Sequence, residues 1–238
     1  MIDTFLGGSL LVLGAVVLAV VGLIVSRKIF HLDKLKDTHE VGGYLLSVVG
    51  TLYAVLLGLI VVDSMAKFQT AREVSESEAN SLADVYVFAG CLPKKERLEV
   101  REACLEYANQ VVDVEWKKMD EGKVDLKARE IIIGINLMLN NFEPQTENQK
   151  AMYPILLQSA SDTWHARRQR TSYATHGPPM VEWISLLAGS VITVIFTYFF
   201  GLDSLKIQMV MTSMVALLIS LNLYLFLLFS YPFSGDLR

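Results

Sequence analysis

Residues 42–62 read GGYLLSVVGTLYAVLLGLIVV, with Glu40 before them, Asp63 directly after them and no ionisable side chain between. A helix needs about 20 apolar residues to cross the ~30 Å hydrocarbon core of a bilayer. This stretch is long and apolar enough to be such a helix. The whole composition agrees, because 53% hydrophobic and 19% charged residues are not typical of a soluble domain.

Three further stretches of the chain have the same character: residues 5–25, 183–202 and 209–229. The first ends at Arg27 and Lys28, is too long for a signal-peptide core and has Asp3 where a signal peptide carries positive charge, so we expect a retained helix. Residues 1–62 are therefore predicted to hold two transmembrane helices. Residues 181–238 are predicted to hold two more, followed by a short C-terminal tail.

The residues between the two pairs differ sharply in composition, since residues 63–182 hold 15 of the 21 Lys and Arg and 19 of the 25 Asp and Glu. We expect residues 63–180 to form a helical extramembrane region. No breaker follows the second span, so its helix should continue as one rod to residue 89. Helices are also predicted between Pro93 and Gly122, over 126–142 and over 145–174. The predicted fold is an all-α integral membrane protein with this helical region inserted between the second and third spans.

The helix between Pro93 and Gly122 carries an apolar row with spacings of three, four and seven residues, which is typical of a helix face that packs against something. The row comprises Leu98, Leu105, Ala108, Val112, Trp116 and Met119.

Small residues recur on one side of two spans. In the second span they are Gly43, Ser47, Gly50, Ala54 and Gly58, and in the third they are Ser185, Gly189, Thr193, Thr197 and Gly201. Small residues let membrane helices approach closely, so helix packing is the simpler interpretation. The alternative is that one row lines an aqueous path, because hydroxyl groups and exposed backbone can solvate an ion.

The sequence lacks the residues that several classes of function require. No Asp, Glu, Lys, Arg or His lies within a span, which argues against proton pumps and ion-coupled carriers but not against a passive pore. There is no G-x-S-x-G, H-E-x-x-H or P-loop motif, and the four histidines are scattered, so we expect no catalytic residues, metal site or cofactor. The net charge of −4 argues against nucleic acid as a partner. Cys91 and Cys104 are more simply two free thiols in a reducing compartment, and the alternative is a single disulfide bridge between them.

Charged residues at two places leave two interpretations open. Glu78 interrupts an apolar stripe; it is more simply a carboxylate at the edge of the packed face, or alternatively a buried carboxylate with a partner. Arg167, Arg168 and Arg170 form a basic cluster about a dozen residues before the third span. Such a cluster usually serves topology or binds anionic lipid, and around a central vestibule it would attract anions.

A set of residues from about 39 to the C-terminus resembles the bestrophin-like membrane family, long carried as a domain of unknown function. The set comprises His39, Glu40, Val41, Gly42, Gly50, Tyr53, Gly58, Glu78, Ala79, Arg101, Tyr107, Glu115, Trp116, Pro179, Trp183, Pro232, Phe233, Ser234 and Gly235. True bestrophins are similar in having four spans, a helical cytosolic region between the second and third, and a Pro-Phe-Gly segment after the fourth, to which Tyr231 to Asp236 can be aligned.

The resemblance implies a pentamer around one anion pore lined mainly by the second span. It assigns the pore-lining or packing face to Gly43, Ser47, Gly50, Tyr53, Ala54, Leu57 and Gly58. Candidates for the hydrophobic neck of such a pore are Tyr53, Leu56, Leu57 and Ile60. The sequence departs from true bestrophins where it ends at Arg238 without a long tail, and where Asp236 stands alone in place of an acidic run, so calcium gating is not expected.

The orientation in the membrane is nearly balanced on charge. If the basic residues after the first helix stay inside the cell, the helical region lies outside. When the flanks of all four spans are counted, six basic residues lie on the side of the helical region and five on the other side, which favours the opposite orientation. The resemblance favours a multi-pass protein of the cell membrane with both termini and the helical region in the cytosol. Two functions remain open. One is a homo-oligomeric channel for small inorganic ions, which the resemblance implies are anions, and the other is a non-conducting scaffold or sensor whose helical region binds a partner.

Overall fold

The computed structural model describes residues 5–29, 39–200 and 202–235, and every regular element among them is helical. The chain forms two compact units. The spanning unit comprises residues 1–67 and 178–230, and the polar unit comprises residues 68–177 and 231–238. Each is described by itself.

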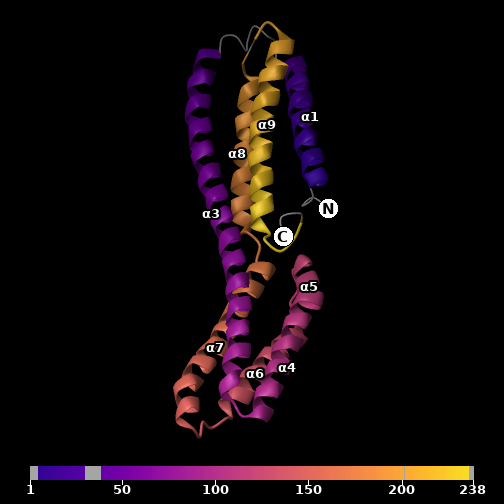
Figure 1. Cartoon of the computed structure of the whole chain (residues 1–238). Helices are drawn as coiled ribbons and strands as arrows, with labels where there is room; N and C mark the ends of the chain where they lie inside the picture. Colours follow the sequence, from indigo (N-terminus) through magenta and orange to yellow (C-terminus); the bar gives the residue numbers. More distant parts are fainter. Residues whose placement is uncertain (1–4, 30–38, 201, 236–238) are drawn as a thin grey trace. The chain divides into compact units, whose positions relative to one another are not determined.

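The spanning unit contains four helices that are long and apolar enough to cross a membrane. They are α1 (Phe5–Ile29), the first part of α3 (His39–Phe88), α8 (Met180–Tyr198) and α9 (Leu205–Ser230). In Figure 1, α8 and α9 lie between α3 and α1. The four predicted spans are confirmed, although α8 ends four residues before the predicted residue 202. The 50-residue α3 confirms that the second helix continues without a break beyond its span.

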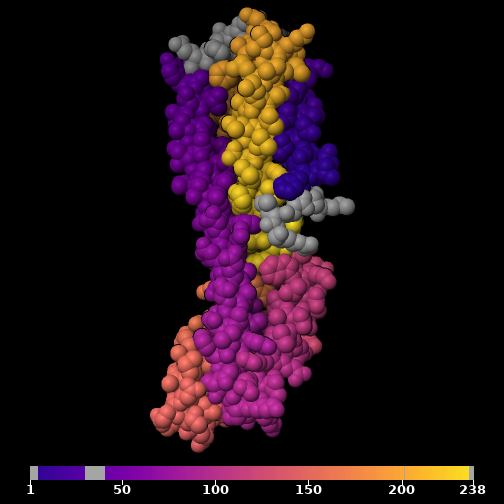
Figure 2. All heavy atoms as spheres, in the orientation of Figure 1, coloured from indigo at the N-terminus to yellow at the C-terminus, as the bar shows by residue number. Residues whose placement is uncertain are grey.

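Tyrosine rings seated on glycines hold α1 to its neighbours. A Cβ on Gly8 would lie 2.0 Å from the Tyr224 ring of α9, and one on Gly22 would lie 2.5 Å from the hydroxyl of Tyr198 on α8. The Tyr198 hydroxyl donates a hydrogen bond to the carbonyl of Ala19 at 2.9 Å. Figure 2 shows α1 lying along α9. Close approach of this kind replaces the hydrophobic effect, which is weak between helices already in lipid.

The polar unit is built from the rest of α3 and from helices that follow it. These are η1 (Ala89–Cys91), α4 (Lys94–Gln110), the π-helix η2 (Val111–Glu115), α5 (Trp116–Asp120), α6 (Leu126–Asn140) and α7 (Glu147–Thr175). Helices lie over each range predicted for this region, with small shifts of their ends. Pro154 lies inside α7, which begins at Glu147 under a capping box from Thr146 and Gln149.

The core of the polar unit is formed where α3, α4, α6 and α7 meet. Buried members include Val85, Cys104, Tyr107, Ile132, Ile135, Leu139 and Leu156. The apolar row predicted on α4 does not all face this core. Leu98 and Leu105 are each 56% exposed and Val112 is 67% exposed, whereas Met119 is buried. The face that packs inside the chain is therefore the one carrying Cys104 and Tyr107.

Candidate functional site

The seven residues predicted on the second span divide into two groups in the structure. Tyr53 and Leu57 are buried against Leu186 of α8 and Phe226 of α9. The Tyr53 hydroxyl also donates a hydrogen bond to the carbonyl of Leu186 at 3.1 Å. These two side chains attach α3 to the rest of the spanning unit.

The other residues of this row point away from the unit's interior. Ser47, Ala54 and Gly58 are exposed, and a Cβ added to Gly50 or Gly58 would meet nothing within 4 Å. Gly43 is half-buried, with the nearest atom of the Phe200 ring 3.8 Å from its added Cβ. In a single chain this part of the row is therefore an open surface.

The row on α8, in contrast, is packed within the chain. A Cβ on Gly189 would come within 2.2 Å of the Tyr53 ring, so only glycine lets that ring lie here. Thr193 and Thr197 are buried, and the Thr197 and Thr212 hydroxyls are 3.2 Å apart. Gly201, the last member of the predicted row, lies outside the described residues. The described part of this row is a helix-packing surface.

A polar contact lies at the end of the spanning unit where α1 and α9 meet the segment after α8. The Arg27 side chain donates hydrogen bonds to the Gln208 amide oxygen, one of them at 2.9 Å from Nε, and to the Leu202 carbonyl. Gln208 is 1% exposed and donates in turn to the Thr197 carbonyl at 3.1 Å. A buried amide needs such partners, so this contact fixes the end of α1.

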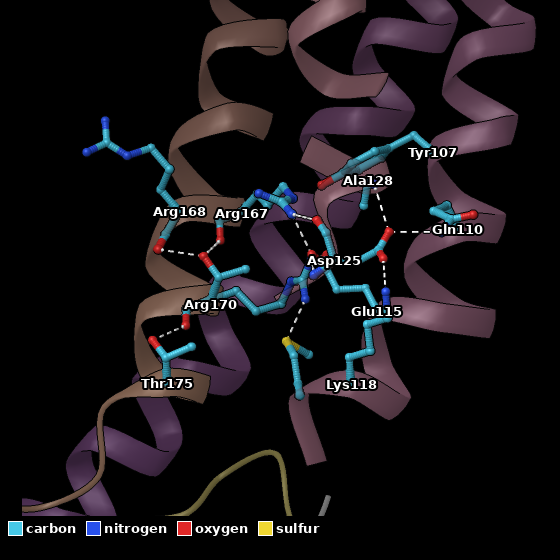
Figure 3. A network of polar contacts seen from close by, with 12 residues as sticks. Tyr107, Gln110, Glu115, Lys118, Asp125, Ala128, Arg167, Arg168, Arg170 and Thr175 are labelled. Carbon is cyan, nitrogen blue, oxygen red and sulfur yellow. Dashed lines mark hydrogen bonds and ion pairs between the residues drawn. The ribbon is translucent and has the colours of Figure 1, made fainter. Parts of the chain in front are cut away.

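The polar unit contains a buried ion network that joins α3, η2 and α7. Figure 3 shows the part of this network around Glu115, Arg167 and Arg170. Arg170 donates to both Glu78 carboxylate oxygens, at 2.6 Å and 2.9 Å, and to Glu115 at 2.7 Å. Arg167 pairs with the other Glu115 oxygen and donates to the Asp125 carbonyl at 2.9 Å. Glu78 and Glu115 are 4% and 0% exposed, so neither pair is a surface contact.

This network settles the two open interpretations of charged residues differently. Glu78 is a buried carboxylate with partners, so the simpler interpretation of an edge position is wrong. Of the basic cluster, Arg167 and Arg170 are 2% and 1% exposed, and only Arg168 is exposed. The burial of the other two guanidinium groups leaves Arg168 alone available for the predicted contact with lipid or anions.

A π-helical turn makes the network possible. Tyr107, Val111, Glu115 and Met119 follow one another at intervals of four residues, which would drift by about 120° around a regular α-helix. The wider turn of η2 over Val111–Glu115 takes up this drift. Glu115 therefore stays on the inner side, beside Arg167 and Arg170.

The surroundings shift the pKa values of Tyr107 and Arg170. Burial, and then the neighbouring Glu78 carboxylate, raise the pKa of Tyr107, whose hydroxyl donates to Glu78 at 2.6 Å. Burial alone would lower the pKa of Arg170, but Glu78 and Glu115 outweigh it and raise that pKa, so the guanidinium stays charged.

Asp125 closes the far side of the network and begins α6. Its carboxylate accepts hydrogen bonds from the Ala128 N–H at 2.9 Å and from Gln110 at 2.8 Å, and it pairs with Lys118. Burial acts to raise the pKa of Asp125, but these donors lower it to about 2.

The residues after the fourth span return to the polar unit. Phe233 is 5% exposed and meets Trp116 edge to face, with ring centroids 5.7 Å apart. Arg170 lies 5.8 Å from the same Trp116 ring, which is within cation–π range. The predicted Tyr-Pro-Phe-Ser-Gly segment therefore contacts the network through one shared aromatic ring. Asp236 lies outside the described residues.

Within residues 5–29, 39–200 and 202–235, no group of three or more histidine, cysteine or acidic side chains is placed to hold a metal ion. Cys91 and Cys104 are both free, and Cys104 is buried. Sequence reasoning missed the partners of Arg167 and Arg170, and also the Arg27–Gln208 contact. The position of Glu78 inside an apolar stripe was the signal that could have led to the network.

The family model described as Bestrophin-like domain matches residues 13–238, and the chain belongs to this family. The match begins within the first span, upstream of residue 39, where the sequence resemblance placed its start. A search of curated proteins finds no match.

Solved structures with the same fold include two crystal structures of a bacterial bestrophin homolog from Klebsiella pneumoniae. One carries an isoleucine-to-threonine mutation, has a TM-score of 0.68 and 13% sequence identity, and covers 94% of this chain and 92% of that chain. The other carries a leucine-to-threonine mutation, with a TM-score of 0.67, 13% identity and coverage of 94% and 91%. A crystal structure described as a membrane protein with a proline-to-alanine change has a TM-score of 0.66, 13% identity and coverage of 94% and 90%. The chain is thus a helical membrane protein with a bestrophin-like fold.

Proposed function

We propose that this chain forms an oligomeric, bestrophin-like ion channel that passes small anions through a central pore lined by α3. Its membership of the Bestrophin-like domain family supports channel function over catalysis. The absence of ionisable residues from the predicted spans also fits a passive pore better than a pump.

The observation that carries the proposal is how little of the second span the chain covers by itself. In the most apolar 18-residue stretch of the second span, only 11% of the residues are buried within the chain. The corresponding share is 22% in the first and third spans and 28% in the fourth. Copies arranged around an axis would cover part of α3 and leave one side facing the axis, because cyclic symmetry creates an axial path. We assign that side to Ser47, Gly50, Ala54 and Gly58, whose small size would leave room for an ion.

A second feature supports self-association. Leu98, Leu105 and Val112 lie seven residues apart along α4 and η2 and are all more than half exposed. An apolar row at this spacing is typical of a helix face that packs on another helix. No described residue of this chain buries that row, so we assign it to a contact with a second copy. The resemblance to true bestrophins favours five copies.

The channel proposal is tested by reconstituting the purified oligomer in a planar lipid bilayer with a chloride gradient. We expect currents whose reversal potential follows the chloride gradient, and we expect Gly58→Leu to reduce them. The matched control is Leu59→Ile, because Leu59 is 67% exposed and is not part of the small-residue row. Silent bilayers from folded oligomer would reject the proposal.

The polar unit is proposed to face the cytosol of a cell-membrane protein. A membrane-impermeant maleimide applied to intact cells tests this orientation through Cys91. Cys91 is half-buried and can react, whereas Cys104 is only 2% exposed. We expect no labelling until the membrane is permeabilised. Labelling of intact cells would place the polar unit outside.

A non-conducting scaffold or sensor is the second candidate, because the exposed row on α4 and η2 would also suit a different protein as partner. The native mass of the detergent-solubilised protein separates the two. A closed ring of several copies favours the channel, whereas a monomer favours the scaffold.

A further inference from the structure

The spanning unit has a cavity of about 460 Å³ on the side of α8 and α9 where α1 lies. Small side chains form much of it: Ala15 and Ala19 from α1, Ser190 from α8, and Ala216 and Ser220 from α9. Leucine, isoleucine and valine side chains complete the wall, and Tyr198 lies among them. The volume is within the ~300–1,000 Å³ range of small-molecule sites.

The polar atoms in this wall already have partners. The Ser190 hydroxyl donates to the Leu187 carbonyl at 2.7 Å, and the Ser220 hydroxyl donates to the Ala216 carbonyl at 2.7 Å. The Tyr198 hydroxyl donates its hydrogen bond to the Ala19 carbonyl. The cavity therefore requires no hydrogen bond from its occupant and offers van der Waals contact alone, which suits a hydrocarbon chain.

The length of the cavity along α8 is close to the thickness of one leaflet of a bilayer. Along α8 it runs from Leu187 to Tyr198, which is about 16 Å at the helical rise of 1.5 Å per residue. Half of a ~30 Å hydrocarbon core is about 15 Å. Tyr198 marks the end that approaches the segment after α8, so an acyl chain would enter from that side.

Positive charge gathers at that same end. Arg27 is held there by Gln208 and the Leu202 carbonyl, and Lys28 follows it on α1 with an exposed side chain. Lys206, two residues before Gln208 on α9, is exposed as well, while Asp203 is the acidic side chain on the described part of the adjoining segment. Basic side chains at a membrane surface attract anionic headgroups.

We propose that this cavity binds one acyl chain of an anionic phospholipid, whose phosphate lies at Lys28 and Lys206. The choice of lipid over a neighbouring subunit rests on the proposed function, because a pore lined by α3 places α1, on the opposite side of α8 and α9, at the lipid-facing edge of the ring.

The test is native mass spectrometry of the detergent-solubilised oligomer after incubation with palmitoyl-oleoyl phosphatidylglycerol or with the phosphatidylcholine of the same chains. We expect one phosphatidylglycerol per chain, with at least tenfold lower occupancy by phosphatidylcholine. Val191→Trp, at a 55% exposed residue of the cavity wall, should lower phosphatidylglycerol occupancy at least tenfold. Val17→Trp is the matched control, because Val17 is 61% exposed and does not line the cavity, and it should leave occupancy unchanged.

The combined variant Lys28→Gln with Lys206→Gln should remove the preference for phosphatidylglycerol while leaving phosphatidylcholine binding unchanged. The proposal is overturned if Val191→Trp binds as much lipid as Val17→Trp, if both lipids bind equally to the natural protein, or if Val191→Trp changes the number of subunits, since a neighbouring chain would then fill the cavity. Silent bilayers with a normal lipid adduct would reject the channel and leave the lipid site standing.

Discussion

Different interactions stabilise the interiors of the polar unit and the spanning unit. The polar unit has its own hydrophobic core and a buried ion network, so most of its contacts are completed within one chain. The spanning unit relies on close approach of small residues to aromatic rings and leaves most of α3 uncovered. The difference indicates that the polar unit is stabilised largely by contacts within one chain, whereas one chain alone leaves much of α3 without contacts.

The largest effect is expected from breaking the network of the polar unit. Arg170→Met would leave the Glu78 carboxylate and one side of Glu115 buried without their cation, which typically costs about 3–5 kcal/mol. Chemical denaturation of the detergent-solubilised protein, followed by circular dichroism, measures the change. Arg168→Met is the control, because Arg168 is exposed, and it should stay within about 0.5 kcal/mol of the natural protein. An equal loss of unfolding free energy in both variants would mean that the buried ion pairs of Arg170 stabilise the protein no more than the exposed Arg168 does.

A smaller effect is expected at the α3–α8 contact of the spanning unit. Gly189→Ala places a methyl group against the Tyr53 ring, and overpacking of this kind costs about 1–3 kcal/mol. Gly58→Ala should cost nothing, because its methyl group meets no other atom. Thermal melting in detergent compares the two. Pairing Gly189→Ala with Tyr53→Leu should restore part of the loss, and no restoration would contradict the ring contact.

The acid sensitivity of the polar unit is expected to depend on Asp125. The folded-state pKa of Asp125 is lowered from 3.8 to about 2, so its stabilising contribution is present above about pH 4 and is lost as the pH falls towards 2. The difference in melting temperature between the natural protein and Asp125→Asn should therefore be largest above pH 4 and narrow towards pH 2. A constant difference across this range would count against the charged contacts of Asp125.

The smallest effect concerns thiol reactivity and leaves stability unchanged. Burial raises the pKa of Cys104 to about 12 and also raises that of Cys91, which is less buried. At pH 8 we expect slow labelling of Cys91 by maleimide and labelling of Cys104 only after denaturation, because the thiolate is the reactive form. Intact mass should show one label on the native protein and two on the denatured protein. Rapid double labelling would mean that the polar unit opens readily.

Much of the fold could be predicted because hydrocarbon imposes a strict requirement. A stretch such as residues 42–62 has few alternatives to a spanning helix, since every backbone polar group must be satisfied inside the segment. The helix between Pro93 and Gly122 was also predictable, because these two residues mark its ends.

The site was harder to predict because its partners are far apart in sequence. Arg170 and Glu78 are separated by 92 residues, and Glu115 reaches them only through a π-helical turn that no spacing rule announces. The row through Leu98, Leu105 and Val112 has a clear period, but periodicity says that a face is apolar and not which molecule covers it. The second-span row likewise divides because Tyr53 and Leu57 lie on the side of α3 that packs against α8 and α9, whereas Ser47, Ala54 and Gly58 lie on its exposed side.

The return of Phe233 to Trp116 also bears on how the protein is made. A ribosome releases the N-terminal part first, so α3 to α7 emerge before the last span has been synthesised. The surface formed by Ala71, Trp116 and Met119 then stays unfilled until Phe233 has been synthesised. The polar unit can therefore be completed only after α9 has been synthesised.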